Sequence, residues 1–330
     1  MGESRKVRAL SLLSGGLDSL LAVKVLQGQG VEVVGISFVS PFFGSANAEK
    51  GAAELGCELM VVDITEEMMG LVKGAPHGFG KQMNPCIDCH TLMVRKAGEI
   101  MRERGFDFIA TGEVLGERPM SQNRQSLDTV ARGSGFEDLL LRPLSAKLLP
   151  PTRPEREGLV DRDRLLAIEG RSRKPQIELA EKYGIKSYVQ PAGGCLLTDP
   201  AFSRRLRELL KNEPDATARD AGLLHLGRHF RLPSGAKAIV GRDERDNGRI
   251  AEAALPEETL IVSDITPGPT TLLVGGGSDE DVKLAAELCA TYSDSGGEEV
   301  DMAIRRRGEE GRVSARPRPR EEFKKFKIGG

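Results

Sequence analysis

The chain has 330 residues, of which 39% are hydrophobic and 29% are charged, which is typical of a globular protein with two or three domains. Its 47 basic and 49 acidic residues give a formal net charge of −2, so the chain as a whole is not a polycation. Any contact with a polyanion must come from local basic patches. Trp is absent and aromatic residues make up only 4%, which argues against binding single strands by stacking bases on aromatic rings.

The cysteines are interpreted through the expected compartment. Residues 1–6 lead directly into a short apolar strand, a pattern that fits no signal peptide. No apolar run approaches the ~20 residues of a membrane span. We therefore expect a cytoplasmic protein with no membrane partner, in which cysteines stay reduced and serve chemistry or the core. The five cysteines are Cys57, Cys86, Cys89, Cys195 and Cys289.

Apolar strands and amphipathic helices alternate over the first third of the chain. Strands are predicted at 7–13, 31–39, 59–64 and 106–111, and helices at 20–26, 46–55 and 91–104. This alternation predicts the α/β class, with a doubly wound parallel sheet covered by helices on both faces. In such sheets ligands bind beyond the carboxyl ends of the strands.

A glycine pair separates the first predicted strand from the first predicted helix. The string is Ser14-Gly15-Gly16-Leu17-Asp18-Ser19. The glycines let the backbone approach an anion, and the N–H groups and dipole of the following helix favour negative charge. Ser14 and Ser19 add hydroxyl donors. No Gly-Lys-Ser/Thr follows, so this is not a Walker A loop.

These six residues resemble the SGGxDS loop of the PP-loop ATP pyrophosphatases, which cleave ATP between its α- and β-phosphates and transfer AMP to an oxygen. The resemblance implies that Ser14 to Ser19 bind ATP, and that Asp18 helps to hold Mg²⁺ on the pyrophosphate.

A second string ends the fourth predicted strand, at the carboxyl edge of the expected sheet. It runs from Ala110 to Gly116, and we expect Thr111 and Gly112 to lie beside the nucleotide. With Ser121-Gln122 it resembles the TGES-LG…SQ segment of bacterial tRNA 4-thiouridine synthases.

Other parts of the chain extend this resemblance over roughly residues 7–190. Residues 141–144 (Leu-Arg-Pro-Leu) are similar to the RPL segment of the same family, and residues 145–160, rich in Pro and charge, look like a loop or an insertion. The related thiouridylases that make 2-thiouridine carry TGH where this chain has Thr-Gly-Glu, which favours 4-thiouridine as the product.

Three cysteines are candidates for sulfur chemistry. Cys86 and Cys89 stand just before the helix predicted from Thr91, and a helix N-terminus lowers a thiol pKa. Cys195, in a Gly-rich loop, lies 106 residues beyond Cys89. PP-loop tRNA thiolases place cysteines at comparable positions, and in some members three thiolates hold a [4Fe–4S] cluster with one iron open for a sulfide.

Several interpretations of Cys86, Cys89 and Cys195 stay open. A [4Fe–4S] cluster held by the three thiolates fits the count and spacing. A thiol relay, in which one cysteine carries a persulfide and another resolves it, needs no metal. Structural zinc would need a fourth ligand, for which His77 or His90 is available. Cys57 and Cys289 are expected to be core residues.

The last third of the chain has a different pattern of predicted elements. Short β-like runs at 236–240, 259–262 and 270–274 precede a helix at 279–289 and a strand at 300–304. This order predicts a smaller α+β domain. The strings at 240–247 and 261–270 resemble the RNA-binding domain of NFACT proteins. We predict three segments: a catalytic domain over 1–222, this RNA-binding-like domain over 223–304 and a tail over 305–330.

The tail is expected to be basic and flexible. Between residues 305 and 327 ten basic residues outnumber four acidic ones. Such a stretch binds phosphate backbones without reading sequence, and the binding weakens with salt. A solvated charge run is the alternative.

Together these features predict an ATP-dependent tRNA sulfurtransferase in which Asp18, Cys89 and Cys195 are catalytic. Its expected partners are tRNA and a sulfur donor, either free sulfide or a persulfide-carrying protein, and the sequence is compatible with a homodimer. A PP-loop amidotransferase or synthetase acting on a small molecule would explain the loop but not the three cysteines. A non-catalytic RNA-binding protein would explain the tail but leave the loop unused.

Overall fold

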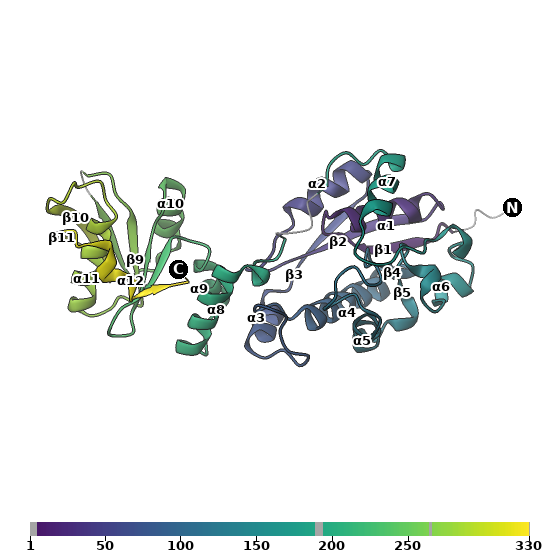
Figure 1. Ribbon diagram of the computed structural model, residues 1–330, viewed down its shortest axis with the longest axis horizontal. Helices are drawn as coiled ribbons and strands as arrows, with labels where there is room; N and C mark the ends of the chain where they lie inside the picture. The colour runs from purple at the N-terminus through teal and green to yellow at the C-terminus, as the bar shows by residue number, and fades with distance from the viewer. Residues whose placement is uncertain (1–4, 189–193, 264–265, 330) are drawn as a thin grey trace. The chain divides into compact units, whose positions relative to one another are not determined.

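The computed structural model describes residues 5–188, 194–263 and 266–329, and the chain forms two compact units, Met1–Thr198 and Asp199–Gly330 (Figure 1). The division falls earlier than the predicted boundary at residue 222. The reason is that helix α8 (Pro200–Asn212) is tied to the second unit, where Glu208 pairs with Arg231 at 2.7 Å. Three residues of the sequence motifs lie outside the described residues: Gly193 in the Gly-rich loop of Cys195, and Asp264 and Ile265 in the string 261–270.

The first unit is built on a parallel sheet of five strands in the order β3-β2-β1-β4-β5. The strands are β1 (Arg8–Leu12), β2 (Glu32–Val39), β3 (Leu59–Asp63), β4 (Phe108–Ala110) and β5 (Leu140–Leu141). The chain runs outward from β1 to β3 and then returns to β4 on the other side of β1. This order confirms the predicted doubly wound sheet.

Helices cover both faces of this sheet (Figure 1). One layer contains α1 (Leu17–Gln27), α2 (Ala46–Leu55) and α7 (Lys174–Tyr183), and the other contains α3 (Thr65–Lys73), α4 (Cys86–Arg104) and α5 (Arg124–Ser134). Helix α1 is buried along most of its length, so the loop that precedes it is fixed by the core. None of the described helices is both long and apolar enough to cross a bilayer.

Two local expectations are corrected in the first unit. Helix α4 begins at Cys86 and not at Thr91, because Pro85 occupies its N-cap and the Pro85 carbonyl accepts a hydrogen bond from Cys89 N at 2.8 Å. The first two cysteines therefore lie within the first turn of the helix. The segment 145–160, expected as a loop or an insertion, contains a 3₁₀ turn (Ala146–Leu148) and the short helix α6 (Arg153–Arg156).

The second unit is the predicted α+β domain. Its sheet has seven strands in the order β11-β10-β8-β9-β7-β6-β12, and every neighbouring pair is antiparallel. The strands are β6 (Arg228–Arg231), β7 (Lys237–Val240), β8 (Thr259–Ser263), β9 (Thr270–Val274), β10 (Val300–Arg306), β11 (Glu309–Ala315) and β12 (Lys327–Ile328). The helices, besides α8, are α9 (Ala218–Leu223), α10 (Glu244–Ala253), α11 (Asp279–Thr291) and α12 (Arg320–Lys324).

The core of the second unit lies on both faces of this sheet. Leu273 and Ala238 face the α11 side, and Leu272 and Ile239 face the side of Ile250 in α10. Cys289 is fully buried among the α11 residues, as expected for a core cysteine.

The expectation of a flexible basic tail is wrong, because this segment is an integral part of the sheet. Strand β11 pairs with β10, β12 pairs with β6, and Phe323 of α12 is only 1% exposed. Composition concealed this because β11 is an edge strand, where charged side chains are common. Among the basic residues of this segment, Arg306 pairs with Asp279, Arg316 with Glu299 and Arg318 with Glu287.

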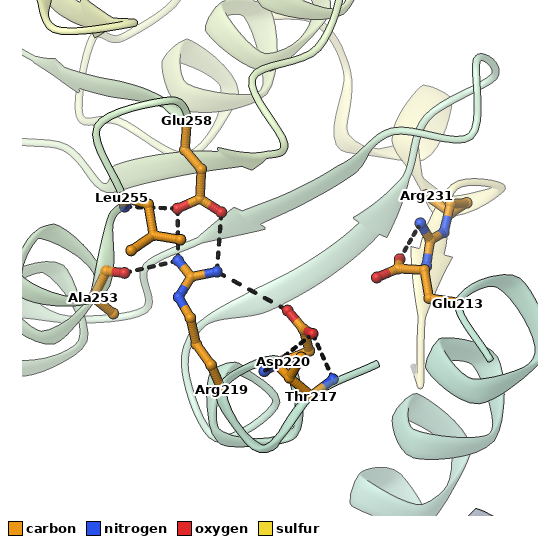
Figure 2. Close-up of polar contacts among 8 residues, drawn as sticks. All are labelled: Glu213, Thr217, Arg219, Asp220, Arg231, Ala253, Leu255 and Glu258. Atoms are coloured by element: carbon orange, nitrogen blue, oxygen red, sulfur yellow. Dashed lines mark hydrogen bonds and ion pairs between the residues drawn. The ribbon is translucent and has the colours of Figure 1, made fainter. Parts of the chain in front are cut away.

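A buried ion pair joins α9 to the turn between α10 and β8 (Figure 2). Arg219 contacts both carboxylate oxygens of Glu258, at 2.6 and 3.1 Å, and also donates to the Ala253 carbonyl at 2.8 Å. Glu258 accepts a further hydrogen bond from Leu255 N at 2.8 Å and is 3% exposed. The same view shows Arg231 of β6 paired with Glu213. These contacts hold the helices before the sheet against it.

Arg219→Ala should destabilise the second unit by about 2–4 kcal/mol, because it leaves a buried carboxylate unpaired. Urea unfolding followed by circular dichroism measures this. The control is Arg153→Ala, which breaks an ion pair with Glu157 that is about half exposed and should cost less than about 1 kcal/mol. Equal small losses for both variants would contradict the assigned role of Glu258.

Candidate active site

Two loops meet where the strand order of the first unit reverses. The loop after β1 contains Gly15 and Gly16, and the loop after β4 contains Gly112. A Cβ atom on Gly112 would lie 2.5 Å from the backbone of Asp18 and Ser19, so the two loops are in direct contact. Ligands of doubly wound sheets bind at this point. The structure thus brings the two predicted nucleotide-binding strings together.

Hydroxyl groups brace the phosphate loop, Ser14 to Ser19. Ser19 Oγ donates to the Gly16 carbonyl at 2.8 Å and accepts from Ser14 N at 3.3 Å, and Ser14 Oγ accepts from Gly16 N at 3.3 Å. Gly15 has a φ of +76°, and a Cβ there would lie 2.2 Å from the Asn47 carbonyl oxygen, so only glycine fits.

The N-terminus of α1 is arranged to receive an anion. Its N-cap is Gly16, which supplies no side-chain hydrogen bond to the first turn. The first N–H groups of a helix have no partner within the helix, and together with the dipole they favour a phosphate. Leu17 is fully buried and anchors this turn, whereas Asp18 is partly exposed.

Asp18 lies in a charged cluster that the sequence did not reveal. Burial raises the pKa of its carboxyl, and the nearby guanidinium groups of Arg173 and Arg118 oppose that rise. Burial and the neighbouring Asp18 likewise raise the pKa of Glu117. Gln176 Nε2 donates to Glu117 Oε2 at 3.4 Å. Glu117 and Arg118 directly follow the Ala110–Gly116 string, but Arg173 and Gln176 carry no sequence signal.

Glu113, the third residue of the Thr-Gly-Glu string, is the centre of a buried polar network. Its carboxylate contacts Arg142 Nε at 2.8 Å, His90 Nδ1 at 2.9 Å and Thr111 Oγ1 at 3.1 Å. Arg142 also donates to the Leu127 carbonyl at 3.1 Å. The network therefore joins the ends of β4 and β5 to the first turns of α4 and to α5.

The network keeps Glu113 ionised. Burial alone would raise the pKa of this carboxyl, but Arg142 and His90 outweigh burial and hold the pKa below its usual range. Arg142 and Glu113 are each 7% exposed at the side chain. Neither Arg142 nor His90 was expected to contact Glu113, although each belongs to a string that the sequence singled out.

The three candidate cysteines share one neighbourhood. The charges of Cys195 and Cys86 both act on the thiol of Cys89, and the charge of Cys86 acts on Cys195. Asn84 Nδ2 donates to Cys86 Sγ at 3.1 Å. Leu196 N donates to the Phe42 carbonyl at 3.0 Å, which fixes the Cys195 segment beyond the carboxyl end of β2.

The expectation of a lowered thiol pKa at this helix N-terminus is wrong for Cys89. Burial raises its pKa above the usual range, and the neighbouring Cys195 and Cys86 raise it further. Burial also raises the pKa of Cys195 to about 11. Positive charge supplied beside such crowded, buried thiols would favour the loss of their protons.

Arg118 connects the cysteines with the phosphate loop. Its guanidinium acts on the carboxyl of Asp18 and also on the thiol of Cys195, and in each case it favours the charged form. Arg118 is exposed and lies on the loop after β4. The phosphate loop and Cys195 therefore lie on the same side of the first unit, within the electrostatic reach of one side chain.

Carboxylates engage both histidines beside the cysteines. His77 Nδ1 lies 2.7 Å from Asp88 Oδ1, and His90 Nδ1 pairs with Glu113, which leaves Nε2 of each ring for a ligand. Among residues 5–188, 194–263 and 266–329, no three or more His, Cys, Asp or Glu side chains are arranged to hold a metal ion.

Two protein families match separate parts of the chain. Residues 4–147 match the family described as "Thiamine biosynthesis protein (ThiI)", and residues 227–327 match "NFACT protein RNA binding domain". The second match includes most of the segment that was expected to be a tail.

Curated relatives match a part of the chain. A tRNA-specific 2-thiouridylase MnmA from Helicobacter hepaticus is 36% identical over 111 residues, which is 31% of this chain and 32% of the relative. A probable tRNA sulfurtransferase from Anoxybacillus flavithermus is 23% identical over 199 residues, which is 49% of each chain. The chain thus spans between about a third and a half of the length of these relatives.

A solved 4-thiouridine synthetase–RNA complex with bound ATP is 23% identical, with a TM-score of 0.38, over 66% of this chain and 53% of the other. The two family matches confirm the resemblances noted in the sequence. Residues 4–147 are similar to the ThiI family, and residues 227–327 are similar to the NFACT RNA-binding domain.

Proposed function

We propose that this protein is an ATP-dependent tRNA sulfurtransferase, which adenylates a uridine carbonyl oxygen and replaces that oxygen with sulfur. The observation that carries the proposal is the position of Arg118, which acts on both Asp18 of the phosphate loop and the thiol of Cys195. The phosphate loop and the Cys195 thiol thus lie within the electrostatic reach of one side chain. The ThiI-type match and the names of the relatives support this reaction class.

The first step uses the phosphate loop. The triphosphate of ATP binds against the N-terminus of α1, and a uridine extruded from its stack presents its carbonyl oxygen to the α-phosphate. The bond from the α-phosphate to the bridging oxygen breaks, and pyrophosphate leaves. Asp18 would hold a Mg²⁺ that balances the charge on the pyrophosphate, and its buried Oδ1, which has no hydrogen-bond partner in the described part of the chain, suits that role.

The second step exchanges oxygen for sulfur. A sulfur nucleophile attacks the adenylated ring carbon, and AMP leaves with the original oxygen. With free sulfide as the nucleophile, the exchange needs no further reactant. If Cys195 or Cys89 carries a persulfide, its outer sulfur attacks the ring carbon. A second cysteine then attacks the inner sulfur, which breaks the S–S bond and leaves the outer sulfur on the ring. That route leaves a disulfide, which an external thiol must reduce.

Cys86, Cys89 and Cys195 share a neighbourhood, but in the described part of the chain they are not arranged to hold a metal ion, so they would have to move closer together to become three thiolate ligands. A [4Fe–4S] cluster there would supply the positive charge that buried thiols need to ionise, and would offer an open iron for sulfide. Zinc held with the Nε2 of His77 or His90, and the metal-free relay, are the other outcomes of the test below.

The second unit would bind the tRNA. Its NFACT-type match and the basic segment 305–327 support this role. Ten basic residues there exceed the acidic ones by six, although Arg306, Arg316 and Arg318 pair with acidic residues outside the segment. The remaining excess of positive charge attracts phosphate groups regardless of the nucleotide sequence.

The purified protein should release AMP and pyrophosphate from ATP when unmodified tRNA is added. Asp18→Asn should lower the rate at least about tenfold, because it removes a charge that holds Mg²⁺. Chromatography of the nucleotides measures this. Release without tRNA would favour a small-molecule synthetase or amidotransferase, and no release with intact tRNA binding would favour a non-catalytic RNA-binding protein.

Cys86→Ser, Cys89→Ser and Cys195→Ser should each abolish thiolation but preserve tRNA-dependent pyrophosphate release, because adenylation precedes sulfur transfer. Cys57→Ser, outside the cluster, is the control. A broad visible absorption after anaerobic purification, lost in all three variants, would identify the cluster. A colourless active protein without bound zinc would identify the relay.

The thiolated position is expected to be carbon 4, because this chain has Glu113 where 2-thiouridine enzymes are expected to carry His. Many of the similar proteins are nevertheless named 2-thiouridylases. Mass spectrometry of tRNA nucleosides from a deletion strain, with standards for both isomers, decides this. Loss of 2-thiouridine alone would contradict the expectation.

A further inference from the structure

Two carboxylates and an amide from three separate segments converge beside the phosphate loop. Asp18 belongs to the first turn of α1, Glu117 to the loop after β4 and Gln176 to α7. Gln176 Nε2 donates to Glu117 Oε2 at 3.4 Å, and Asp18 lies close enough that its charge raises the pKa of Glu117. The amide head and the two carboxylates therefore share one neighbourhood.

Two oxygen atoms of this group lack partners. Asp18 Oδ1 and Gln176 Oε1 are buried and have no hydrogen-bond partner within residues 5–188, 194–263 and 266–329. Gln176 is 0% exposed. A buried polar atom without a partner costs about 1–3 kcal/mol. Two such oxygens in one cluster indicate that the group interacts with a positively charged ligand.

The chemistry of the group selects the ligand. Carboxylate and amide oxygens are the ligands of hard cations, and Mg²⁺ is usually held by one or two carboxylates together with substrate phosphates. A half-turn of the Gln176 amide would present Oε1 to a cation between Asp18 and Glu117. The guanidinium groups of Arg118 and Arg173 lie close to this cluster, where they can bind the remaining phosphate charge.

We propose that Asp18, Glu117 and Gln176 together form a Mg²⁺ site beside the phosphate loop, and that Glu117 and Gln176 are ligands outside the Ser14–Ser19 string. The inference rests on the proposed use of ATP, whose pyrophosphate end this cation would hold. It also connects the loop after β4 and α7 with nucleotide binding. Both segments would then respond when ATP arrives or pyrophosphate leaves.

The test is titration of the full-length protein with Mn²⁺, followed by electron paramagnetic resonance, alone and with α,β-methylene-ATP. Glu117→Gln and Gln176→Leu should each weaken Mn²⁺ binding by about tenfold to a hundredfold. Gln176→Glu should tighten it, because a third carboxylate faces the cation. The affinity of the metal-free nucleotide should stay unchanged in Gln176→Leu.

Glu103→Gln, on the exposed side of α4, is the matched control, and thermal melting confirms that each variant is folded. Folded Glu117→Gln that binds Mn²⁺ as tightly as the native chain would overturn the inference, as would Gln176→Glu that does not bind it more tightly. If Mn²⁺ binding depends on Glu117 but tRNA triggers no AMP release, the metal site stands and the sulfurtransferase proposal fails.

Discussion

The buried ion pair between Glu113 and Arg142 is the interaction on which the first unit's site depends. Both side chains are 7% exposed, and removing one partner of such a pair typically costs about 3–5 kcal/mol. Because Glu113 also binds His90 and Thr111, one carboxylate fixes the end of β4 and the helix that starts with Cys86 and Cys89. Glu113 thereby positions the cysteine turn relative to the sheet.

The site combines a rigid half with a responsive half. The phosphate loop is fixed, since α1 is buried and a side chain at Gly15 or Gly112 would collide with backbone. By contrast, Asp18, Glu117 and the thiols of Cys89 and Cys195 are groups whose pKa values burial raises. Each of them gains from positive charge. Positive charge would therefore favour the ionised form of these groups on both sides of the proposed reaction.

The two units divide the proposed work. The first holds the phosphate loop and the cysteines, and the second is a seven-stranded antiparallel sheet in which the basic segment runs from one edge strand, β11, to the other, β12. Building Arg305 to Lys327 into strands and a helix limits the conformations that this basic surface can adopt. A rigid basic surface positions a tRNA better than a flexible tail, since less entropy is lost on binding.

The sequence by itself determined the doubly wound sheet, the phosphate loop between β1 and α1, and the α+β domain, because local hydrophobic periodicity and glycine spacing encode them. It also singled out the strings of Glu113, Arg142 and His90, but not their contact. Only the tertiary structure decided which side chains meet: Gln176 beside Glu117, Arg142 beside Glu113, and the basic tail within a sheet. Such contacts join segments tens of residues apart, and a single sequence records no pairing between them. The tertiary structure also reversed the expected pKa of Cys89, because burial is a property of the packed fold and not of a helix end.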